Sequence, residues 1–355
     1  METVFKGLSI CGIASAVPTR WVSVREQFGG DNEETIRAIN KFIKSTGIEG
    51  RYLASDKQTS SDLCFVAAKR LLEEKKISKD RIGLLLFVSQ TTDYRAPATA
   101  MVLHYRLGLS RNCFAFDVNL GCSGYTCGIE IASSILQKSE FDYALLLCGD
   151  TTAREQHPSR NTFEREFDKR LFGDCGTATL ISKDEHSNDI RIIINTDGSG
   201  FKTIITPYEW YRNPDANNKT DSIMDGVEVF NFSTSKAPEM ILELMKKSNT
   251  IPSDYDCLVL HQANELILDR IAKTTGFVAE KNLKSINKYG NTSSASIPTT
   301  LVYNYGNSVG GIFRCILCGF GVGLSWSAVD CYIDKKNILP QIFTDEYFED
   351  GYSLQ

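Results

Sequence analysis

The chain has 355 residues, of which 42% are hydrophobic and 23% are charged, and its formal net charge is −5 at pH 7. These values are typical of a globular enzyme of one large or two medium-sized domains, and they argue against general nucleic-acid binding. No run of about 18 apolar residues predicts a membrane span, the N-terminus lacks a secretory pattern, and eleven irregularly spaced cysteines predict reduced thiols in the cytoplasm.

Helix patterns and strand patterns alternate along the chain. Apolar residues that recur every three or four positions predict helices, and short continuous apolar runs predict strands that are buried on both faces. Their alternation indicates an α/β protein. In chain order, the expected elements are helix 60–74, strand 81–90, strand 113–118, helix 125–139, strand 143–148, helix 237–248, strand 257–260, helix 265–275 and strand 313–317.

Cys122 lies at the corner between strand 113–118 and helix 125–139, in the turn Gly121-Cys122-Ser123-Gly124. This position puts its sulfur at a helix N-terminus, where the unpaired N–H groups and the helix dipole favour the thiolate. The small neighbouring residues leave room for a substrate. We therefore expect a nucleophile, whereas the ordinary alternative in a chain with eleven cysteines is a buried structural thiol.

Two further polar residues occupy comparable positions in the second half. Of the four histidines, only His261 ends an apolar strand pattern and opens a helix pattern. Asn291 lies in a small-residue turn before another helix pattern; taken alone, this turn is an ordinary helix cap, and a lone histidine is more often structural. The two halves echo each other in the order of their elements. Because α/β folds bind ligands at the carboxyl ends of strands, we expect Cys122, His261 and Asn291 to meet.

Five motifs together resemble the β-ketoacyl-acyl-carrier-protein synthase III family of the thiolase superfamily, in the family's order and over about residues 5–332. The resemblance implies a thiolase-like five-layered αβαβα fold of two duplicated halves, in a homodimer. It implies an N-terminal half over 1–182, a C-terminal half over 183–333 and a C-terminal extension over 334–355. The motifs are Asp117…Gly121-Cys122-Ser123-Gly124, Leu171-Phe172-Gly173-Asp174-Cys175-Gly176, His261-Gln262-Ala263-Asn264, Tyr289-Gly290-Asn291-Thr292-Ser293 and Gly319-Phe320-Gly321-Val322-Gly323-Leu324-Ser325-Trp326.

The resemblance also implies a separate catalytic role for each of these residues. Cys122 attacks an acyl thioester and holds the acyl group covalently. His261 and Asn291 donate hydrogen bonds to the carbonyl oxygen of a malonyl thioester while it loses carbon dioxide. The backbone N–H groups of Cys122 and Val322 form the oxyanion hole, and Val322 stands where the family usually has glycine.

Three departures from the family concern the substrates. The stretch 40–48 lacks the Trp and Arg that stack on the adenine of coenzyme A, so we expect a carrier protein to deliver the acyl group, unless Phe42 or Arg51 stacks from a shifted position. Ala96 stands where the family's partner-subunit loop often has Phe before Pro, which predicts a deeper or wider acyl pocket. We expect the polar loop 213–219 near the entrance, and the extension 334–355 to pack on the surface or on a partner.

Two function classes fit these residues. The first is a 3-oxoacyl-[acyl-carrier-protein] synthase III-like enzyme that condenses an acyl thioester with a malonyl thioester on a carrier protein. The second is a same-fold acyltransferase that passes the acyl group from Cys122 to an alcohol or amine. The intact residues argue against a non-catalytic partner protein. Acyl carrier protein and acyl-coenzyme A are the expected partners, without a cofactor. We expect no metal, because the CxxC pair Cys315 and Cys318 lies in a strand pattern without a second pair.

Overall fold

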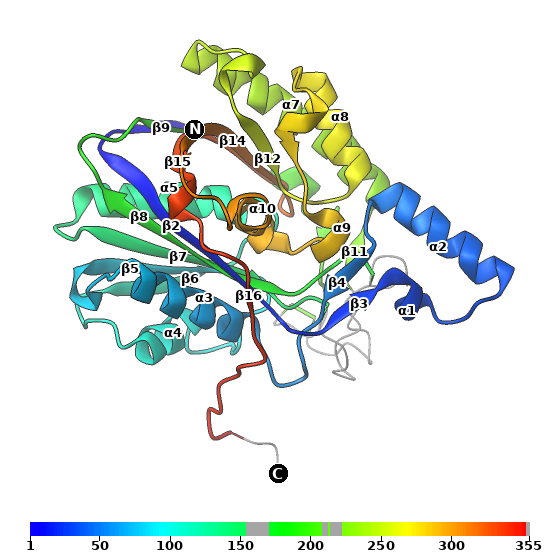
Figure 1. The fold of residues 1–355 in the computed structure, drawn as a ribbon, viewed down its shortest axis with the longest axis horizontal. Helices are drawn as coiled ribbons and strands as arrows, with labels where there is room; N and C mark the ends of the chain where they lie inside the picture. Colours follow the sequence, from blue (N-terminus) through cyan, green and yellow to red (C-terminus); the bar gives the residue numbers. More distant parts are fainter. Residues whose placement is uncertain (154–169, 208–211, 214–221, 353–355) are drawn as a thin grey trace.

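The structure is a computed structural model that describes residues 1–153, 170–207, 212–213 and 222–352 (Figure 1). Two six-stranded sheets form its frame. Among the described residues, no helix is long and apolar enough to cross a membrane.

The first sheet contains the strands around the Cys122 turn. Its core has the order β2-β8-β7-β5-β6, in which β2, β8 and β7 pair antiparallel and β7, β5 and β6 pair parallel. These strands are β2 (Leu8–Val17), β8 (Cys175–Lys183), β7 (Tyr143–Asp150), β5 (Ile82–Val88) and β6 (Phe114–Val118), and the short β16 (Ile342–Phe343) adds to the edge beside β2.

The second sheet repeats this plan. Its core order β9-β15-β14-β12-β13 has the same sequence of antiparallel and parallel pairings, which confirms the expected duplication. The strands are β9 (Ile190–Thr196), β15 (Ser325–Asp334), β14 (Ile312–Gly321), β12 (Cys257–Leu260) and β13 (Asn282–Leu283), and β1 (Glu2–Phe5) lies at the edge beside β9. The division of the chain at 182/183 stays a prediction.

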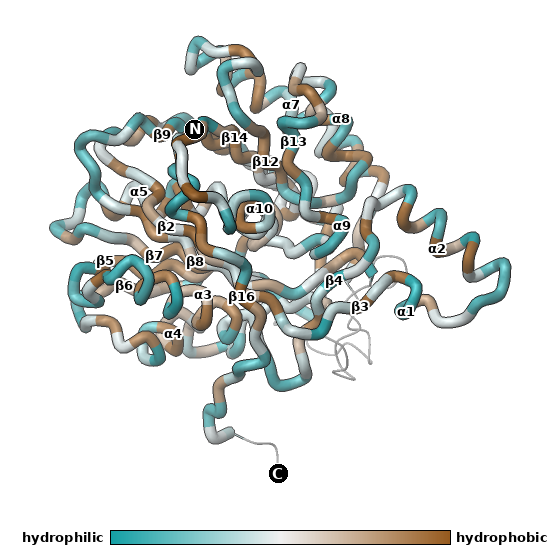
Figure 2. Tube along the Cα trace, in the orientation of Figure 1, coloured by the Kyte–Doolittle hydropathy of each residue, from teal (hydrophilic) through white to brown (hydrophobic). Residues whose placement is uncertain are grey.

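Helices complete the five layers (Figure 1). Helices α5 (Gly124–Lys138) and α10 (Ser296–Tyr305) contribute, with both sheets, to one hydrophobic cluster between the sheets. Helices α3 (Ser60–Glu74) and α4 (Thr99–Leu107) pack with the first sheet in a second cluster, and α7 (Gly226–Ser248) and α8 (Glu265–Thr275) pack with the second sheet in a third. The brown strands of Figure 2 lie inside these layers, as continuous apolar runs require. The predicted αβαβα fold is confirmed.

Smaller elements surround this frame. The arm on the right of Figure 1 contains β3 (Trp21–Ser23), α1 (Val24–Phe28), α2 (Glu33–Thr46) and β4 (Gly50–Tyr52). The short α9 (Ile286–Tyr289) precedes the Asn291 turn, and β10 (Ile204–Ile205) pairs with β11 (Ile223–Met224).

Helix α7 shows where the sequence pattern was misleading. The apolar pattern predicted a helix over residues 237–248. The helix begins instead at Gly226 and contains Pro238 in its interior. Its N-cap is Asp225, whose side chain accepts from the backbone N–H groups of Val227 and Glu228. The first turns therefore form on a local cap, although they lack a clear apolar stripe.

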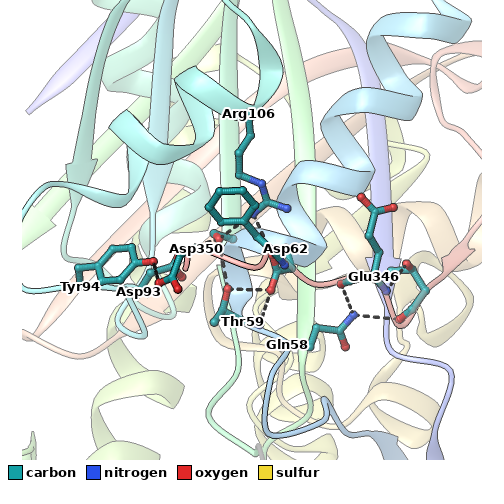
Figure 3. Close-up of polar contacts among 11 residues, drawn as sticks. Gln58, Thr59, Asp62, Asp93, Tyr94, Arg106, Glu346 and Asp350 are labelled. Carbon is teal, nitrogen blue, oxygen red and sulfur yellow. Dashed lines mark hydrogen bonds and ion pairs between the residues drawn. The ribbon is translucent and has the colours of Figure 1, made fainter. Parts of the chain in front are cut away.

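The C-terminal extension packs on the chain's own surface, which is the first of the two predicted arrangements, the other being contact with a partner. After β16, the described residues pass over the N-terminus of α3 (Figure 3). Gln58 donates from Nε2 to the backbone carbonyls of Thr344 and Glu346, both at 3.0 Å. The Phe348 N–H donates to Asp62 at 3.0 Å, and the Tyr94 hydroxyl donates to Asp350.

Candidate active site

Cys122 lies in the turn between β6 and α5, next to the N-cap residue Ser123. Cys122 as a whole residue is partly exposed, whereas the other cysteines apart from Cys11 are buried, but protein atoms surround its sulfur. The end of β14 crosses directly over it: a Cβ on Gly321 would lie 2.9 Å from the Cys122 sulfur and 2.5 Å from its Cβ. Only glycine at position 321 leaves this close approach possible.

The two predicted oxyanion donors both reach the cysteine sulfur. The backbone N–H groups of Cys122 and Val322 lie close enough to the thiol to lower its pKa. The Val322 turn is itself held, because Ser325 donates from its hydroxyl to the Val322 carbonyl at 2.8 Å. Ser325 also lies 2.6 Å from the Ser123 hydroxyl, which joins this turn to the start of α5. Valine in place of glycine therefore keeps the N–H in position.

The expected ionisation of Cys122 is wrong for the free protein. Burial raises the pKa of the thiol to about 12, and the charge of Asp150 raises it further, against the two N–H groups. The helix begins at Gly124, and the residues of its first turn are themselves buried. Removal from water therefore outweighs the two N–H groups here. The sulfur is a thiol in the resting state.

His261 directly follows β12 and is almost completely buried, with 1% of its surface exposed. Its Nδ1 lies 2.8 Å from the Ser296 hydroxyl at the start of α10. Its ring meets the edge of Phe320 at a centroid distance of 5.6 Å. Burial lowers the pKa of His261 to about 3, so that the ring is neutral at physiological pH.

Asn291 is held by backbone contacts on both sides. Its N–H donates to the Leu171 carbonyl at 2.8 Å, and its own carbonyl accepts from the Gly173 N–H at 3.0 Å. Its side-chain oxygen accepts from the Ser293 N–H at 2.9 Å. This bond fixes the amide orientation and leaves the NH₂ group as the donor. The motif around Gly173, whose role the sequence did not reveal, thus positions Asn291.

The turn 291–296 brings the predicted residues together. Ser293 and Ser294 pack against the Cys122 turn: a Cβ on Gly121 would lie 3.3 Å from the Ser293 hydroxyl, and one on Gly124 would lie 3.4 Å from the Ser294 Cβ. The same turn contacts His261 through the Ser293 backbone and Ser296. One connection therefore links the surroundings of all three polar positions, while their catalytic roles stay a prediction.

Other expected residues lie away from this cluster. Ala96 is exposed on the single chain, in the loop between β5 and α4. Phe42 and Arg51 are buried, with 1% and 6% of their surfaces exposed, so neither presents a face on which adenine could stack. Trp21 is 41% exposed and donates from its indole N–H to the Lys288 carbonyl. Residues 214–219 of the polar loop lie outside the described residues.

Comparison with known proteins identifies the family. Residues 116–198 match the family described as 3-Oxoacyl-[acyl-carrier-protein (ACP)] synthase III, and residues 245–332 match its C-terminal part. A β-ketoacyl-[acyl-carrier-protein] synthase III of Clostridium perfringens is 32% identical over 307 residues, which cover 83% of this chain and 91% of that protein. The chain belongs to the β-ketoacyl-acyl-carrier-protein synthase III family.

Further members of the β-ketoacyl-acyl-carrier-protein synthase III family cover nearly the whole chain. A putative 3-oxoacyl-[acyl-carrier-protein] synthase 3 of Campylobacter jejuni is 31% identical over 98% of this chain and 100% of its own length. The solved structure of a 3-oxoacyl-(acyl-carrier protein) synthase of Burkholderia xenovorans is similar with a TM-score of 0.89, at 31% identity, over 97% of this chain and 99% of that one. The protein is therefore an acyltransferase of the condensing type with a thiolase-like fold.

Proposed function

We propose that this protein condenses an acyl group, held on Cys122, with a malonyl thioester, and that carbon dioxide is released in the same reaction. One observation carries the proposal: the backbone N–H groups of Cys122 and Val322 converge on the sulfur, and the turn of Asn291 packs against the same corner. A nucleophile with preformed oxyanion donors is what acyl transfer requires.

The first half-reaction loads the enzyme. The Cys122 sulfur attacks the thioester carbonyl, and the oxyanion that forms accepts from the two backbone N–H groups. The carbon–sulfur bond of the donor then breaks. The Cys122 proton leaves with the departing thiol, so that an acyl-cysteine and a free thiol are formed. Because the pKa of Cys122 is raised, proton removal accompanies the attack rather than preceding it.

The second half-reaction forms the carbon–carbon bond. A malonyl thioester loses carbon dioxide, and negative charge develops on its thioester oxygen. The NH₂ of Asn291 and the neutral ring of His261 donate to this oxygen; with Ser296 as donor to Nδ1, the His261 proton resides on Nε2. The enolate carbon attacks the acyl-cysteine, and collapse of the intermediate returns the Cys122 thiolate, which takes up a proton from solvent.

Two measurements test the proposal. After incubation with an acyl thioester, intact-protein mass spectrometry should show one acyl group, on Cys122, and none in Cys122→Ala. His261→Ala and Asn291→Ala should still become acylated while CO₂ release from malonyl thioester on a carrier protein falls by at least about a hundredfold. Acyl transfer to an alcohol or amine without CO₂ would instead establish the alternative class.

Three finer points belong to the same proposal. A carrier protein, rather than coenzyme A, is the preferred donor, because Phe42 and Arg51 are both buried. The enzyme is a homodimer, in which the exposed loop of Ala96 reaches the acyl pocket of the partner subunit. It works in the cytoplasm, since all eleven cysteines are free thiols.

The donor preference has its own test. Acylation rates of Cys122 are compared with one acyl chain on coenzyme A and on a carrier protein at equal concentrations. The carrier protein should be faster by about tenfold. A faster reaction with coenzyme A that Trp21→Ala weakens would point to the exposed indole as the stacking residue and overturn this preference.

A further inference from the structure

Asp150 is a buried carboxylate that the reaction steps above do not use. It is the last residue of β7, and 1% of its surface is exposed. Among the described residues, no lysine or arginine forms an ion pair with it. Burial raises its pKa, while hydrogen bonds to both oxygens lower it. Burial of a carboxylate without a cation costs free energy of folding unless hydrogen-bond donors surround it.

One carboxylate oxygen of Asp150 holds the loop that follows β5. Oδ1 accepts from the Gln90 N–H at 2.8 Å and from the hydroxyls of Ser89 and Thr91 at 3.2 Å and 3.3 Å. The Gln90 side chain in turn lies against Gly121, where a Cβ would be 2.2 Å from its Oε1. This oxygen therefore anchors the backbone that borders the Cys122 turn.

The other oxygen holds the turn that follows Asn291. Oδ2 accepts from the Ser294 N–H at 3.2 Å and from the Ser294 hydroxyl at 2.7 Å. The preceding Ser293 N–H bonds the Asn291 side chain, and the Ser293 backbone contacts His261. Each oxygen thus accepts from a backbone N–H on a different loop. An amide in place of the carboxylate can accept on one side only.

We propose that Asp150 is a positioning residue that ties the Gln90 loop at the Cys122 turn to the Ser293–Ser294 turn, and thereby positions Asn291 and His261 for the malonyl thioester that reacts with the acyl-cysteine. This inference rests on the proposed function, because it assigns Asn291 and His261 to the malonyl thioester. Asp150 has no hydrogen bond to the Cys122 sulfur, so it acts through the loops. A misplacement of donors by about 1 Å can cost about a hundredfold in rate.

The test compares Asp150→Asn with Asp330→Asn. Asp330 is also a buried carboxylate, but it pairs with Arg314 toward the other end of β14, away from the Cys122 turn. Both variants lose a buried acceptor, so both should unfold at lower temperature than the wild type. Acylation of Cys122 and CO₂ release from malonyl thioester on a carrier protein are measured separately for each.

Asp150→Asn should lower the kcat of CO₂ release by at least about tenfold while acylation of Cys122 stays within about threefold. Asp330→Asn should keep both steps within about threefold of the wild type. Equal losses in both steps of Asp150→Asn, or the same split in Asp330→Asn, would show a structural role only and overturn the proposal. If Asp150→Asn does not fold, Ser294→Ala decides: a smaller loss confined to CO₂ release supports the proposal, and unchanged CO₂ release overturns it.

A third measurement is independent of the condensing activity. Alkylation of Cys122 by iodoacetamide at pH 8 should be about threefold or more faster in Asp150→Asn, because a negative charge near the thiol is gone, and unchanged in Asp330→Asn. If the wild type releases no CO₂, the proposed function fails and the positioning role of Asp150 fails with it; an unchanged alkylation rate would separately contradict the placement of the Asp150 charge near the Cys122 thiol.

Discussion

Cys122 combines a raised pKa with two backbone donors at its sulfur, which makes it a nucleophile that is activated during attack rather than before it. Below the pKa, the thiolate fraction increases tenfold for each pH unit. We therefore predict that alkylation of Cys122 by iodoacetamide accelerates by about tenfold per pH unit from pH 7 to pH 10, without a plateau. A plateau below pH 9 would contradict the raised pKa.

Ser296 offers a second test at the scale of single residues. Its hydroxyl lies 2.8 Å from the His261 Nδ1, and in the proposed reaction it donates to Nδ1 while the ring proton resides on Nε2. We predict that Ser296→Ala lowers CO₂ release by about tenfold and leaves acylation of Cys122 unchanged. Ser133→Ala is the matched control, because this buried helix hydroxyl has no partner and its loss should affect neither step.

His261 itself gives a pH prediction with a definite sign. Its pKa is about 3 in the folded protein and about 6.5 when unfolded, so the unfolded state binds the proton more readily. The stability from the neutral ring is fully present above about pH 6.5 and is lost as the pH falls toward 3. His261→Gln should therefore lose less unfolding free energy than the wild type between pH 6.5 and pH 4 in urea titrations. Parallel losses would contradict this assignment.

At the scale of elements, the C-terminal extension covers an ion pair between two helices of the first half (Figure 3). Asp62 of α3 and Arg106 of α4 are 2.8 Å apart, and their side chains are 3% and 5% exposed. The Phe348 ring lies 4.7 Å from the Arg106 guanidinium, and its N–H donates to Asp62. The extension thereby holds the pair out of water, where loss of one partner is costly.

We predict that Arg106→Met lowers the free energy of unfolding by about 3–5 kcal/mol, because it leaves the buried Asp62 carboxylate without its cation. Chemical denaturation measures this loss. The control is Arg37→Met, which breaks a pair with Glu33 whose side chains are 78% and 88% exposed, and should leave the stability unchanged. Equal effects of the two variants would contradict the burial of the pair between Asp62 and Arg106.

At the scale of the whole molecule, we predict a homodimer in which the exposed loop of Ala96 contacts the partner subunit. Light scattering should give twice the chain mass of 39.6 kDa. In such a dimer, Ala96→Phe should fill space in the partner's acyl pocket and shift acylation of Cys122 toward shorter acyl chains, with the shortest chain unaffected. A chain-length profile that Ala96→Phe leaves unchanged would remove this residue from the pocket.

The fold class could be predicted from the sequence, whereas the catalytic roles of Cys122, His261 and Asn291 stay predictions. Helices 60–74 and 265–275 and strand 257–260 have the predicted bounds, because strong apolar periodicity and complete burial coincide there. The start of α7 could not be predicted, since the Asp225 cap is a local hydrogen bond that leaves no periodic signal.

The order of motifs along the chain thus determined the family and the fold, and it predicts the roles of Cys122, His261 and Asn291. Only the tertiary structure decided their chemistry. Burial, which depends on the packing of both halves, reversed the expected ionisation of Cys122 and keeps His261 neutral. The tertiary structure also revealed the hydrogen bonds of Asp150 to Gln90 and Ser294. No spacing in the sequence predicts these bonds, because they form only where two loops that are distant in the sequence meet in space.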